Sequence, residues 1–167
     1  MKNKNIVINA IIIAIYVSIS LLLSSFSFGP IQIRVAEVLL VLCLYNKKYI
    51  FPITIGCFIT NLVGFINGLN PIVIDIIVGT FATFISGILV YYFRNIRIFN
   101  LPIFSLIIPA IINGILIGLE LHYYFSIKLS LLIAYIGISE FISVCLLGLL
   151  LYKPIGKLIK AYLEWYN

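Results

Sequence analysis

Residues 129–152 read LSLLIAYIGISEFISVCLLGLLLY, and the only charged side chain in this stretch is Glu140. About 20 consecutive apolar residues form a helix that is long enough to cross the hydrocarbon core of a bilayer. Similar apolar runs occupy residues 6–26, 49–66, 71–93 and 101–121. A shorter run, residues 31–45, includes Arg34 and Glu37, and we interpret it as a short or partly re-entrant helix.

The composition agrees with a membrane protein. The chain is 63% hydrophobic and only 10% charged, whereas a soluble domain carries roughly 25% charged residues. A chain of 167 residues cannot hide so much apolar surface in one water-soluble core. The connections between the runs are short and rich in Gly, Pro and Asn. We therefore predict an all-α, polytopic membrane protein with six transmembrane helices in a single transmembrane domain, residues 1–167.

The distribution of basic residues indicates the orientation of the chain. Six helices place both termini on one side of the membrane. That side would carry nine basic residues: Lys2, Lys4, Lys47, Lys48, Arg94, Arg97, Lys153, Lys157 and Lys160. The opposite side would carry only Arg34 and Lys128. The positive-inside rule then predicts that both termini are cytoplasmic, and it explains the net charge of +6 without nucleic-acid binding.

Polar residues inside the predicted spans are the candidates for function, because burying a carboxylate in hydrocarbon is costly. In this topology four of the five acids lie at or outside the midplane, on the external side: Glu37, Asp75, Glu120 and Glu140. Asn61 and Asn113 lie in the outer halves of their helices. We therefore predict a polar cavity that opens outward with a negative balance of charge. It would suit a ligand rich in hydrogen-bond donors or one with a cationic amine.

Structural explanations remain open for some of these acids. Asp75 lies in the first turn of its helix, where an acid complements the helix dipole. Glu120 would mark the end of a span. Glu140 is the hardest to explain structurally, because it lies deep in an uncharged run with Ser139 and Ser143 beside it.

The other polar residues also have structural alternatives. Asn61 and Asn113 could join neighbouring helices by hydrogen bonds. Arg34 and Glu37, at positions i and i+3, could pair on one face of a helix.

The cysteines and the histidine argue against catalysis. Cys43, Cys57 and Cys145 lie in apolar runs without metal-ligand spacing, and we interpret them as small buried hydrophobic residues. His122 is the only histidine, so we expect no metal site and no cofactor. The sequence contains no evident nucleophile–base pair and no nucleotide-binding motif. We therefore predict that the protein is not an enzyme and does not hydrolyse ATP itself.

Small residues four apart predict close helix packing. Such pairs occur at residues 10–14, 64–68 and 114–118. The first of them, Ala10-x-x-x-Ala14, gives its helix a smooth stripe against which another helix could pack.

Several segments together resemble one known family. They are FGPIQIRVAE at residues 28–37, GCFITNL at 56–62, DIIVGT at 75–80, GLEL at 118–121 and GISE at 137–140. In this order they resemble the QueT family of queuosine-precursor transporters, and the Gln-x-Arg-x-x-Glu element is the most specific part. The resemblance extends from the first helix to Pro154. Ser139 departs from the pattern, in which we expect a glycine before the glutamate.

The resemblance implies an architecture and a set of partners. QueT proteins are substrate-binding S-components of energy-coupling factor (ECF) importers in the bacterial plasma membrane. An S-component is a six-helix bundle with its pocket near the external face and a lid formed by the loop between the first two helices. Its partners are a transmembrane coupling protein, EcfT, and two ATPase subunits. Ala10 and Ala14 match the small-residue element through which first helices of S-components contact EcfT.

The resemblance also implies a 7-deazaguanine substrate, in particular prequeuosine 1. The candidate binding residues are Gln32, Arg34, Glu37, Asn61, Asp75, Asn113, Glu120 and Glu140. One carboxylate could accept from the ring N–H and the exocyclic amine of a guanine-like edge, and a second would suit the protonated aminomethyl group. Phe65, Tyr123 and Tyr124 are candidates for stacking on the base.

Other functions remain open at this point. The nearest alternative is an S-component for another vitamin, such as thiamine. A second is a proton-coupled secondary transporter that uses Glu140 or Asp75, although the chain shows no clear inverted repeat. A third is a structural membrane subunit, which would bind no ligand.

Overall fold

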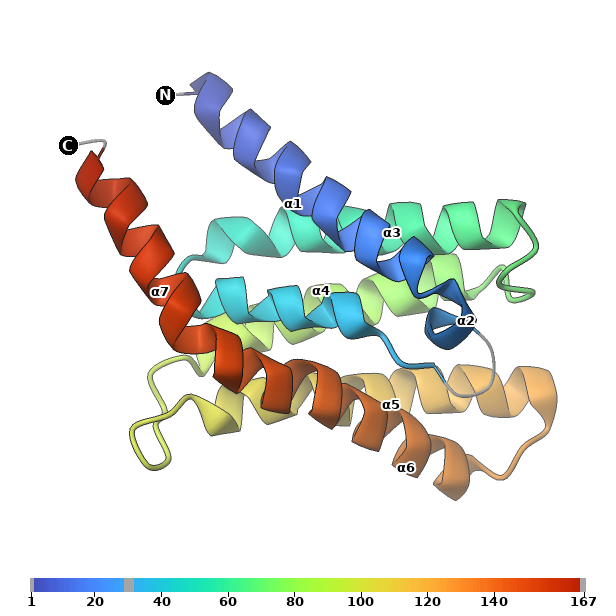
Figure 1. Ribbon diagram of the computed structural model, residues 1–167. Helices are drawn as coiled ribbons and strands as arrows, with labels where there is room; N and C mark the ends of the chain where they lie inside the picture. Colours follow the sequence, from blue (N-terminus) through green and yellow to red (C-terminus); the bar gives the residue numbers. More distant parts are fainter. Residues whose placement is uncertain (1, 29–31, 166–167) are drawn as a thin grey trace.

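The computed structural model describes residues 2–28 and 32–165, and this part of the chain is helical without strands. The all-α prediction is therefore confirmed (Figure 1). In chain order the elements are α1 (Lys2–Leu22), α2 (Ser24–Ser27), the 3₁₀-helices η1 (Val35–Leu44) and η2 (Lys47–Tyr49), α3 (Ile50–Ile66), α4 (Asp75–Tyr92), α5 (Ile103–Phe125), α6 (Leu129–Glu140), the π-helix η3 (Phe141–Leu146) and α7 (Leu147–Trp165).

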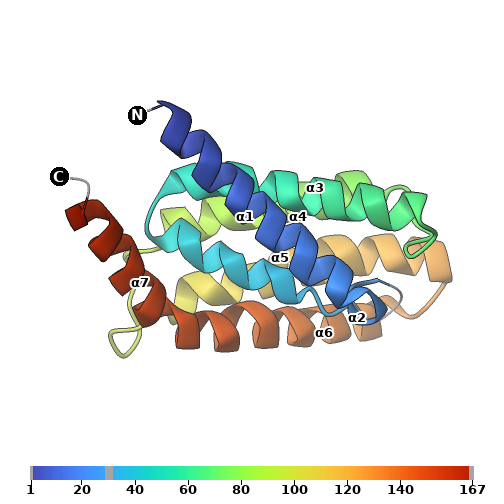
Figure 2. The ribbon, with the colours of Figure 1, turned by 45° about the horizontal axis from the view of Figure 1, so that its top comes forward.

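The helices form a bundle in which α1 begins and α7 ends on the same side of the molecule (Figures 1 and 2). In both Figure 1 and Figure 2, α1 crosses α3 obliquely. α5 packs between α4 and α6, and α3 packs between α1 and α4. Gly114 and Gly118 bring α5 against α6, because a Cβ added at either position would lie 3.3 Å or less from Ile133. The packing role predicted for this glycine pair is therefore confirmed.

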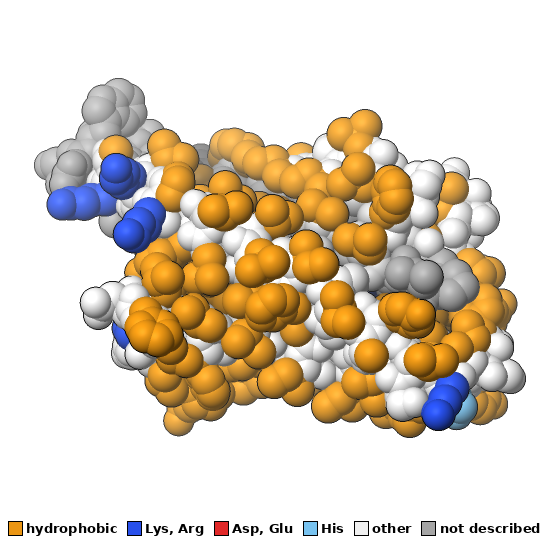
Figure 3. Space-filling model, turned by 60° about the horizontal axis from the view of Figure 1, so that its bottom comes forward, with side chains coloured by type: hydrophobic (Ala, Val, Ile, Leu, Met, Phe, Trp, Pro, Cys, Tyr) orange, Lys and Arg blue, Asp and Glu red, His pale blue; other side chains and the backbone are white. Residues whose placement is uncertain are grey.

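Five helical segments in the described part of the chain are long and apolar enough to cross a membrane. They are residues 5–22, 47–66, 75–92, 103–125 and 129–161. Large hydrophobic side chains on these segments face outward, among them Ile77 and Leu150, which are 73% and 71% exposed. Figure 3 shows the apolar surface that results. Such a surface is stable in lipid, so the chain is a multi-pass membrane protein.

The predicted short second helix has a different geometry. Residues 32–34 have no regular secondary structure, and residues 35–44 form the 3₁₀-helix η1. Ile31, the predicted start of this helix, lies outside the described residues together with Gly29 and Pro30. With ten residues, η1 is shorter than each of the five long segments, which have at least 18 residues. A short helix is therefore present in the predicted range 31–45, but it is a 3₁₀-helix and covers only residues 35–44.

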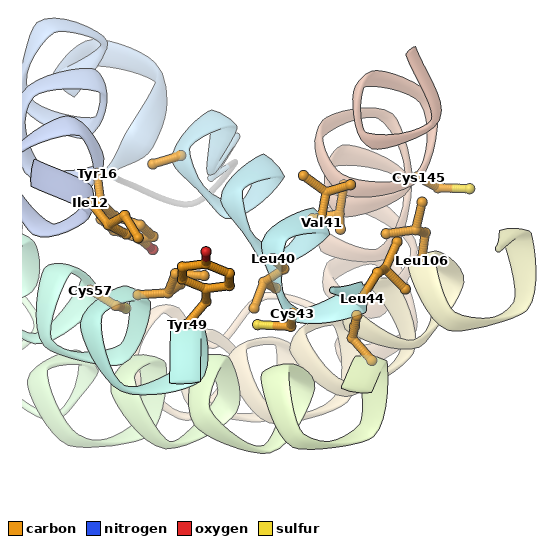
Figure 4. Packing of buried hydrophobic residues seen from close by; sticks show 14 residues of the cluster. Ile12, Tyr16, Leu40, Val41, Cys43, Leu44, Tyr49, Cys57, Leu106 and Cys145 are labelled. Carbon is orange, nitrogen blue, oxygen red and sulfur yellow. The ribbon is translucent and has the colours of Figure 1, made fainter. Parts of the chain in front are cut away.

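η1 lies inside the bundle. Leu40, Val41 and Cys43 are fully buried, and η1 contacts α1, α3, α4, α5, η3 and α7. Figure 4 shows Leu40, Val41 and Leu44 in the middle of a cluster, with Tyr16 of α1 on one side and Cys145 of η3 on the other. These contacts let tightly wound backbone survive in the membrane, because neighbouring helices cover it.

Other predicted boundaries were also wrong by several residues. α1 covers Lys2–Leu22 and not residues 6–26. α4 begins at Asp75, not at residue 71, because Asn70 and Pro71 belong to the turn before it. α5 continues to Phe125 instead of ending at residue 121. The last helix continues to Trp165 instead of ending at residue 152, because Pro154 lies inside α7 and does not terminate it.

Candidate functional site

A buried ion pair joins the segment before η1 to the start of α4. Arg34 Nη2 lies 2.6 Å from Asp75 Oδ1, and the two side chains are 7% and 1% exposed. Arg34 Nε also donates to Gln32 Oε1 at 3.0 Å. Asn70 Nδ2 donates to the second Asp75 oxygen at 2.6 Å, and Asn61 Nδ2 donates to the Asp75 backbone carbonyl at 2.9 Å. Both charges are therefore paired and hydrogen-bonded, which is the condition for burying an ion pair without a large loss of stability.

Gly79 makes room for this network one turn along α4. A Cβ at position 79 would lie 2.5 Å from Asp75 Oδ1, 2.7 Å from Asn61 Nδ2 and 2.9 Å from Arg34 Nη1. A residue without a side chain is therefore required here for the Arg34–Asp75 pair to lie against the helix.

Glu37 is held by only one of its two carboxylate oxygens. Its Oε1 accepts from Tyr16 Oη at 2.7 Å and from Thr83 Oγ1 at 2.5 Å, and its side chain is 0% exposed. Its Oε2 has no hydrogen-bond partner in the described part of the chain. The pairing of Arg34 with Glu37 on one helical face, an alternative that the sequence left open, is not formed. Arg34 precedes the helix and pairs with Asp75 instead.

Glu140 lies where the last long helix changes its winding. α6 ends at Glu140, and the π-helix η3 begins at the next residue. Glu140 is 0% exposed, and neither of its carboxylate oxygens has a hydrogen-bond partner in the described residues. Glu37 and Arg34 act on it electrostatically, and Asn113 of α5 is a close polar neighbour. π-helical segments occur frequently at functional sites, where they redirect a side chain.

Nine described residues leave buried side-chain polar atoms without partners, and those of four residues, from four segments, belong to carboxylates and amides in the interior of the bundle. These atoms are Gln32 Nε2, Glu37 Oε2, both side-chain polar atoms of Asn113 and both carboxylate oxygens of Glu140. We call these four residues the interior polar group. Buried polar atoms are normally hydrogen-bonded, because an unsatisfied one costs about 1–3 kcal/mol. A small ligand that supplies these bonds would therefore be stabilised inside the bundle.

The chemistry of the interior polar group favours a particular kind of ligand. Glu37, Glu140 and the Asn113 carbonyl provide acceptors, whereas the donors are the amide groups of Gln32 and Asn113. Such a set matches a flat molecule with several N–H groups and one or two carbonyl or ring-nitrogen acceptors. The two acids also favour a ligand that carries a positive charge.

Glu120 lies apart from this group, at the outer end of α5. It faces a hollow of about 390 Å³ between α4 and α5, which Ile74, Tyr123 and Tyr124 also line. Its carboxylate oxygens have no partner in the described residues, and Asp75 and Arg34 act on it electrostatically. It therefore lies near the ion pair but faces the outer surface.

The aromatic residues predicted to stack on the base lie on the surface. Tyr123 is 86% exposed, Tyr124 is 50% exposed and Phe65 is 38% exposed. Tyr124 Oη donates to the Pro71 carbonyl at 3.3 Å. Tyr123 and Tyr124 line the same hollow as Glu120, at the outer end of α5. The stacking role of the three aromatic residues stays a prediction.

Several functional candidates were not found from the sequence. Tyr16 and Thr83 hold Glu37, Asn70 holds Asp75, and Ser139 Oγ donates to the Gln32 backbone carbonyl at 2.6 Å. Cys57 is not simply a small hydrophobic residue, because its Sγ accepts from Thr83 at 3.3 Å and from Asn61 at 3.6 Å.

A weak sequence signal existed for only part of this set. Ser139 stands beside Glu140, which was already a candidate, and Asn70 lies in the turn five residues before Asp75. Tyr16 and Thr83 had no such signal, because a tyrosine or threonine within an apolar span is ordinary.

A metal centre is not indicated. Within residues 2–28 and 32–165, no three His, Cys, Asp or Glu side chains are grouped so that they could hold a metal ion. The four interior acids and amides are suited to an organic ligand instead.

Comparisons with known proteins identify the family to which this chain belongs. The model of the QueT transporter family matches residues 6–157. The chain is 35% identical over 167 residues to the queuosine precursor transporter QueT of Lactococcus lactis subsp. cremoris (strain MG1363), with 93% of this chain and 94% of the relative covered. No solved structure matches the chain. From the family match over most of the chain and from this relative, we conclude that the protein belongs to the QueT transporter family.

Proposed function

We propose that this chain is the substrate-binding subunit of an ECF-type importer for a queuosine precursor, a 7-deazaguanine such as prequeuosine 1. The observation that supports this most directly is the interior polar group, in which Gln32, Glu37, Asn113 and Glu140 have buried polar atoms without partners. The relative from Lactococcus lactis is named as a queuosine precursor transporter. The chain supplies binding alone, and partner subunits supply ATP hydrolysis.

The ligand chemistry complements the interior polar group. A 7-deazaguanine presents a ring N–H and an exocyclic amine side by side, and one carboxylate can accept from both. The aminomethyl group of prequeuosine 1 is protonated at neutral pH and suits the second acid. Amide donors from Gln32 or Asn113 can reach the ring carbonyl. Arg34, Asp75 and Asn61 already form hydrogen bonds within the protein. We therefore assign them a supporting role, in which they hold the segments that carry the ligand-binding residues.

We also propose that η1 provides a sixth crossing of the membrane. A 3₁₀-helix rises about 2.0 Å per residue, so the ten residues of η1 extend about 20 Å. This is about two thirds of the ~30 Å thickness of the hydrocarbon core, and the non-helical residues 32–34 precede η1. Six crossings are consistent with the start of α1 and the end of α7 at one end of the bundle, which is the cytoplasmic end in the plasma membrane by the positive-inside rule.

The exposed face of α1 is the proposed contact for the coupling protein EcfT and, through it, for the two ATPase subunits. Ala10 and Ala14 lie on this face and are exposed. The opposite face holds α1 to the bundle through Ile12, Tyr16 and Ser20, which are buried. A stripe of small residues on an otherwise apolar helix allows a partner helix to approach closely. The proposed lid over the substrate is the segment between α2 and η1, of which residues 29–31 lie outside the described part of the chain.

Ligand binding by the purified chain tests this function. We would measure the thermal shift and the calorimetric affinity with prequeuosine 1, queuine, guanine and thiamine. We expect prequeuosine 1 or queuine to stabilise the protein, because a ligand that binds only the folded state raises its stability. Asn113→Ala and Glu140→Gln should each weaken binding at least tenfold, as expected for the loss of a hydrogen bond to a charged or buried partner.

A matched control is available in the same chain. Asn67 is exposed, and its amide donates only to the Val63 carbonyl of its own helix, at 2.9 Å. Asn67→Ala should leave the affinity unchanged. Binding of thiamine without any 7-deazaguanine would preserve the S-component role and reject the substrate. Uptake that depends on the proton gradient and not on ATP would reject the ECF mechanism.

A further inference from the structure

A second polar feature lies at the end of the bundle where α7 leaves it. A hollow of about 330 Å³ opens beside the end of η1, and it is lined by Tyr45, Tyr152, Lys153, Gly156, Lys157 and Lys160. No residue of the interior polar group contributes to it. Figure 3 shows basic side chains gathered at this end of the molecule, beside the apolar surface that covers its middle. This hollow therefore needs an explanation that is separate from the substrate site.

The floor of the hollow consists of two tyrosine rings that are held in place by stacking and by hydrogen bonds. Tyr45 and Tyr152 are stacked, with ring centroids 5.7 Å apart and an angle of 20° between the rings. Tyr45 Oη donates to the Tyr152 backbone carbonyl, and Arg97 Nη1 donates to Tyr152 Oη at 2.8 Å. A Cβ at Gly156 would lie 2.7 Å from Tyr45 Oη. Groups from η1, α7 and the α4–α5 connection thus fix the shape of the hollow.

The wall of the hollow is positively charged. Lys153, Lys157 and Lys160 follow the i, i+4, i+7 spacing and so lie on one face of α7. Lys153 and Lys157 form no ion pair with an acid in the described part of the chain. Like charges four residues apart destabilise a helix. An anion bound between them would remove this cost.

An apolar strip continues the lysine face toward the middle of the membrane. Leu146 and Leu150 precede Lys153 and Lys157 on the same face, and they are 45% and 71% exposed. This face of the last helix is therefore apolar toward the middle of the membrane and cationic toward its end. A free anion would need only the cationic end, whereas a lipid would use both.

The length of the helix places the lysines at the level of the lipid headgroups. Residues 129–161 form 33 residues of apolar helix, which is about 50 Å at 1.5 Å per residue. This exceeds the ~30 Å hydrocarbon core, so the last turns emerge among the headgroups. We propose that the hollow binds the phosphate of an anionic phospholipid headgroup, while an acyl chain of the same lipid lies along Leu146 and Leu150. Basic pockets on the cytoplasmic side of membrane bundles are suited to such headgroups.

Lipid titration of the full chain tests this proposal. The protein in a neutral detergent would be titrated with phosphatidylglycerol, with phosphatidylcholine and with inorganic phosphate, and bound lipid would be counted by native mass spectrometry. We expect one tightly bound phosphatidylglycerol and no comparable binding of the other two. The double variant Lys153→Gln/Lys157→Gln should bind phosphatidylglycerol roughly thirtyfold more weakly, from about 1 kcal/mol per lysine.

A charge-matched control separates a defined site from general attraction. Lys47→Gln/Lys48→Gln removes the same charge from η2, next to the end of η1. It should retain the tight lipid, and both double variants should keep the unfolding temperature of the parent in phosphatidylcholine. Equal losses in the two double variants, or inorganic phosphate binding as tightly as the lipid, would overturn the proposal. Unchanged lipid binding with failed assembly on the coupling module would assign the hollow to a protein partner instead.

Discussion

Two glutamates at the centre of the molecule are both fully buried, but only one is fixed. Tyr16 and Thr83 hold one oxygen of Glu37, so the other oxygen has a defined direction. Glu140 has no such support among the described residues. Preorganised groups bind a ligand more tightly, because less freedom is lost on binding. We infer that Glu37 sets the orientation of the substrate and that Glu140 adapts to it.

Removing the hydroxyl of Tyr16 tests the role of this support. In Tyr16→Phe, Glu37 keeps only the bond from Thr83, so its free oxygen is less well directed. We expect the affinity for prequeuosine 1 to fall about tenfold, as measured by calorimetry, because a hydrogen bond to a charged group contributes about 1.5–3 kcal/mol. Tyr135→Phe is the control, because Tyr135 is 49% exposed. Unchanged affinity in Tyr16→Phe would show that Thr83 alone is sufficient.

Because Gly79 lies against the Arg34–Asp75 pair, we predict that replacing it by alanine destabilises the protein, whereas the same change at Gly148 does not. Gly79→Ala would place a methyl group within 3 Å of three polar atoms, which requires the network to move. We expect a loss of about 2 kcal/mol or more in the free energy of unfolding in detergent.

Gly148→Ala is the matched control. Its methyl group would lie 3.5 Å from Leu106, an ordinary contact. The change should be neutral or stabilising by up to about 1 kcal/mol, because alanine favours helix more than glycine does. Equal effects of the two substitutions would contradict the constraint at position 79.

At the scale of elements, the long helices were predictable and their exact winding was not. The five long apolar runs correspond to five helices, because length and hydrophobicity alone identify a span. Neither the 3₁₀ winding of η1 nor the π winding of η3 was predictable, since both depend on what surrounds the segment. The last predicted span ended at residue 152, but α7 continues to Trp165 with Pro154 inside it.

The members of the site were predictable, but their grouping was not. The cost of burying a charge identified Glu37, Asp75 and Glu140, and all three are buried. The sequence could not show that Asp75 is fully paired while Glu140 is not. That distinction depends on which elements meet in space, such as Gln32 with Ser139, which are 107 residues apart.

The contact between Ser139 and the segment before η1 predicts an effect on release of the ligand. Ser139 Oγ holds the Gln32 carbonyl at 2.6 Å, next to the proposed lid. In Ser139→Ala we expect faster dissociation of prequeuosine 1, by about fivefold, and an unchanged association rate, as measured by stopped-flow fluorescence. Ser130→Ala, at an exposed position of α6, is the control. A slower association rate instead would indicate that the segment is needed for entry and not for retention.

At the scale of the whole molecule, the proposed function separates substrate binding from coupling across α1. One face of this helix contacts Glu37 of the proposed substrate site through Tyr16, and the other carries Ala10 and Ala14 at the surface. Ala14→Trp should therefore abolish uptake by the assembled importer and leave the calorimetric affinity of the isolated chain unchanged. Ile77→Trp is the control at a lipid-facing position of α4, where Ile77 is 73% exposed. Loss of binding in Ala14→Trp would contradict this separation.

The shortness of η1 also has a consequence for how the protein is made. A segment of ten residues that contains a glutamate does not partition into the bilayer by itself when it leaves the translocon. It becomes stable only after α1, α3 and α4 have gathered around it. The segment that contributes Gln32, Arg34 and Glu37 is therefore inserted late in biogenesis. Defects in the surrounding helices should then appear first as degradation of newly made chains, before any loss of transport by the mature protein can be measured.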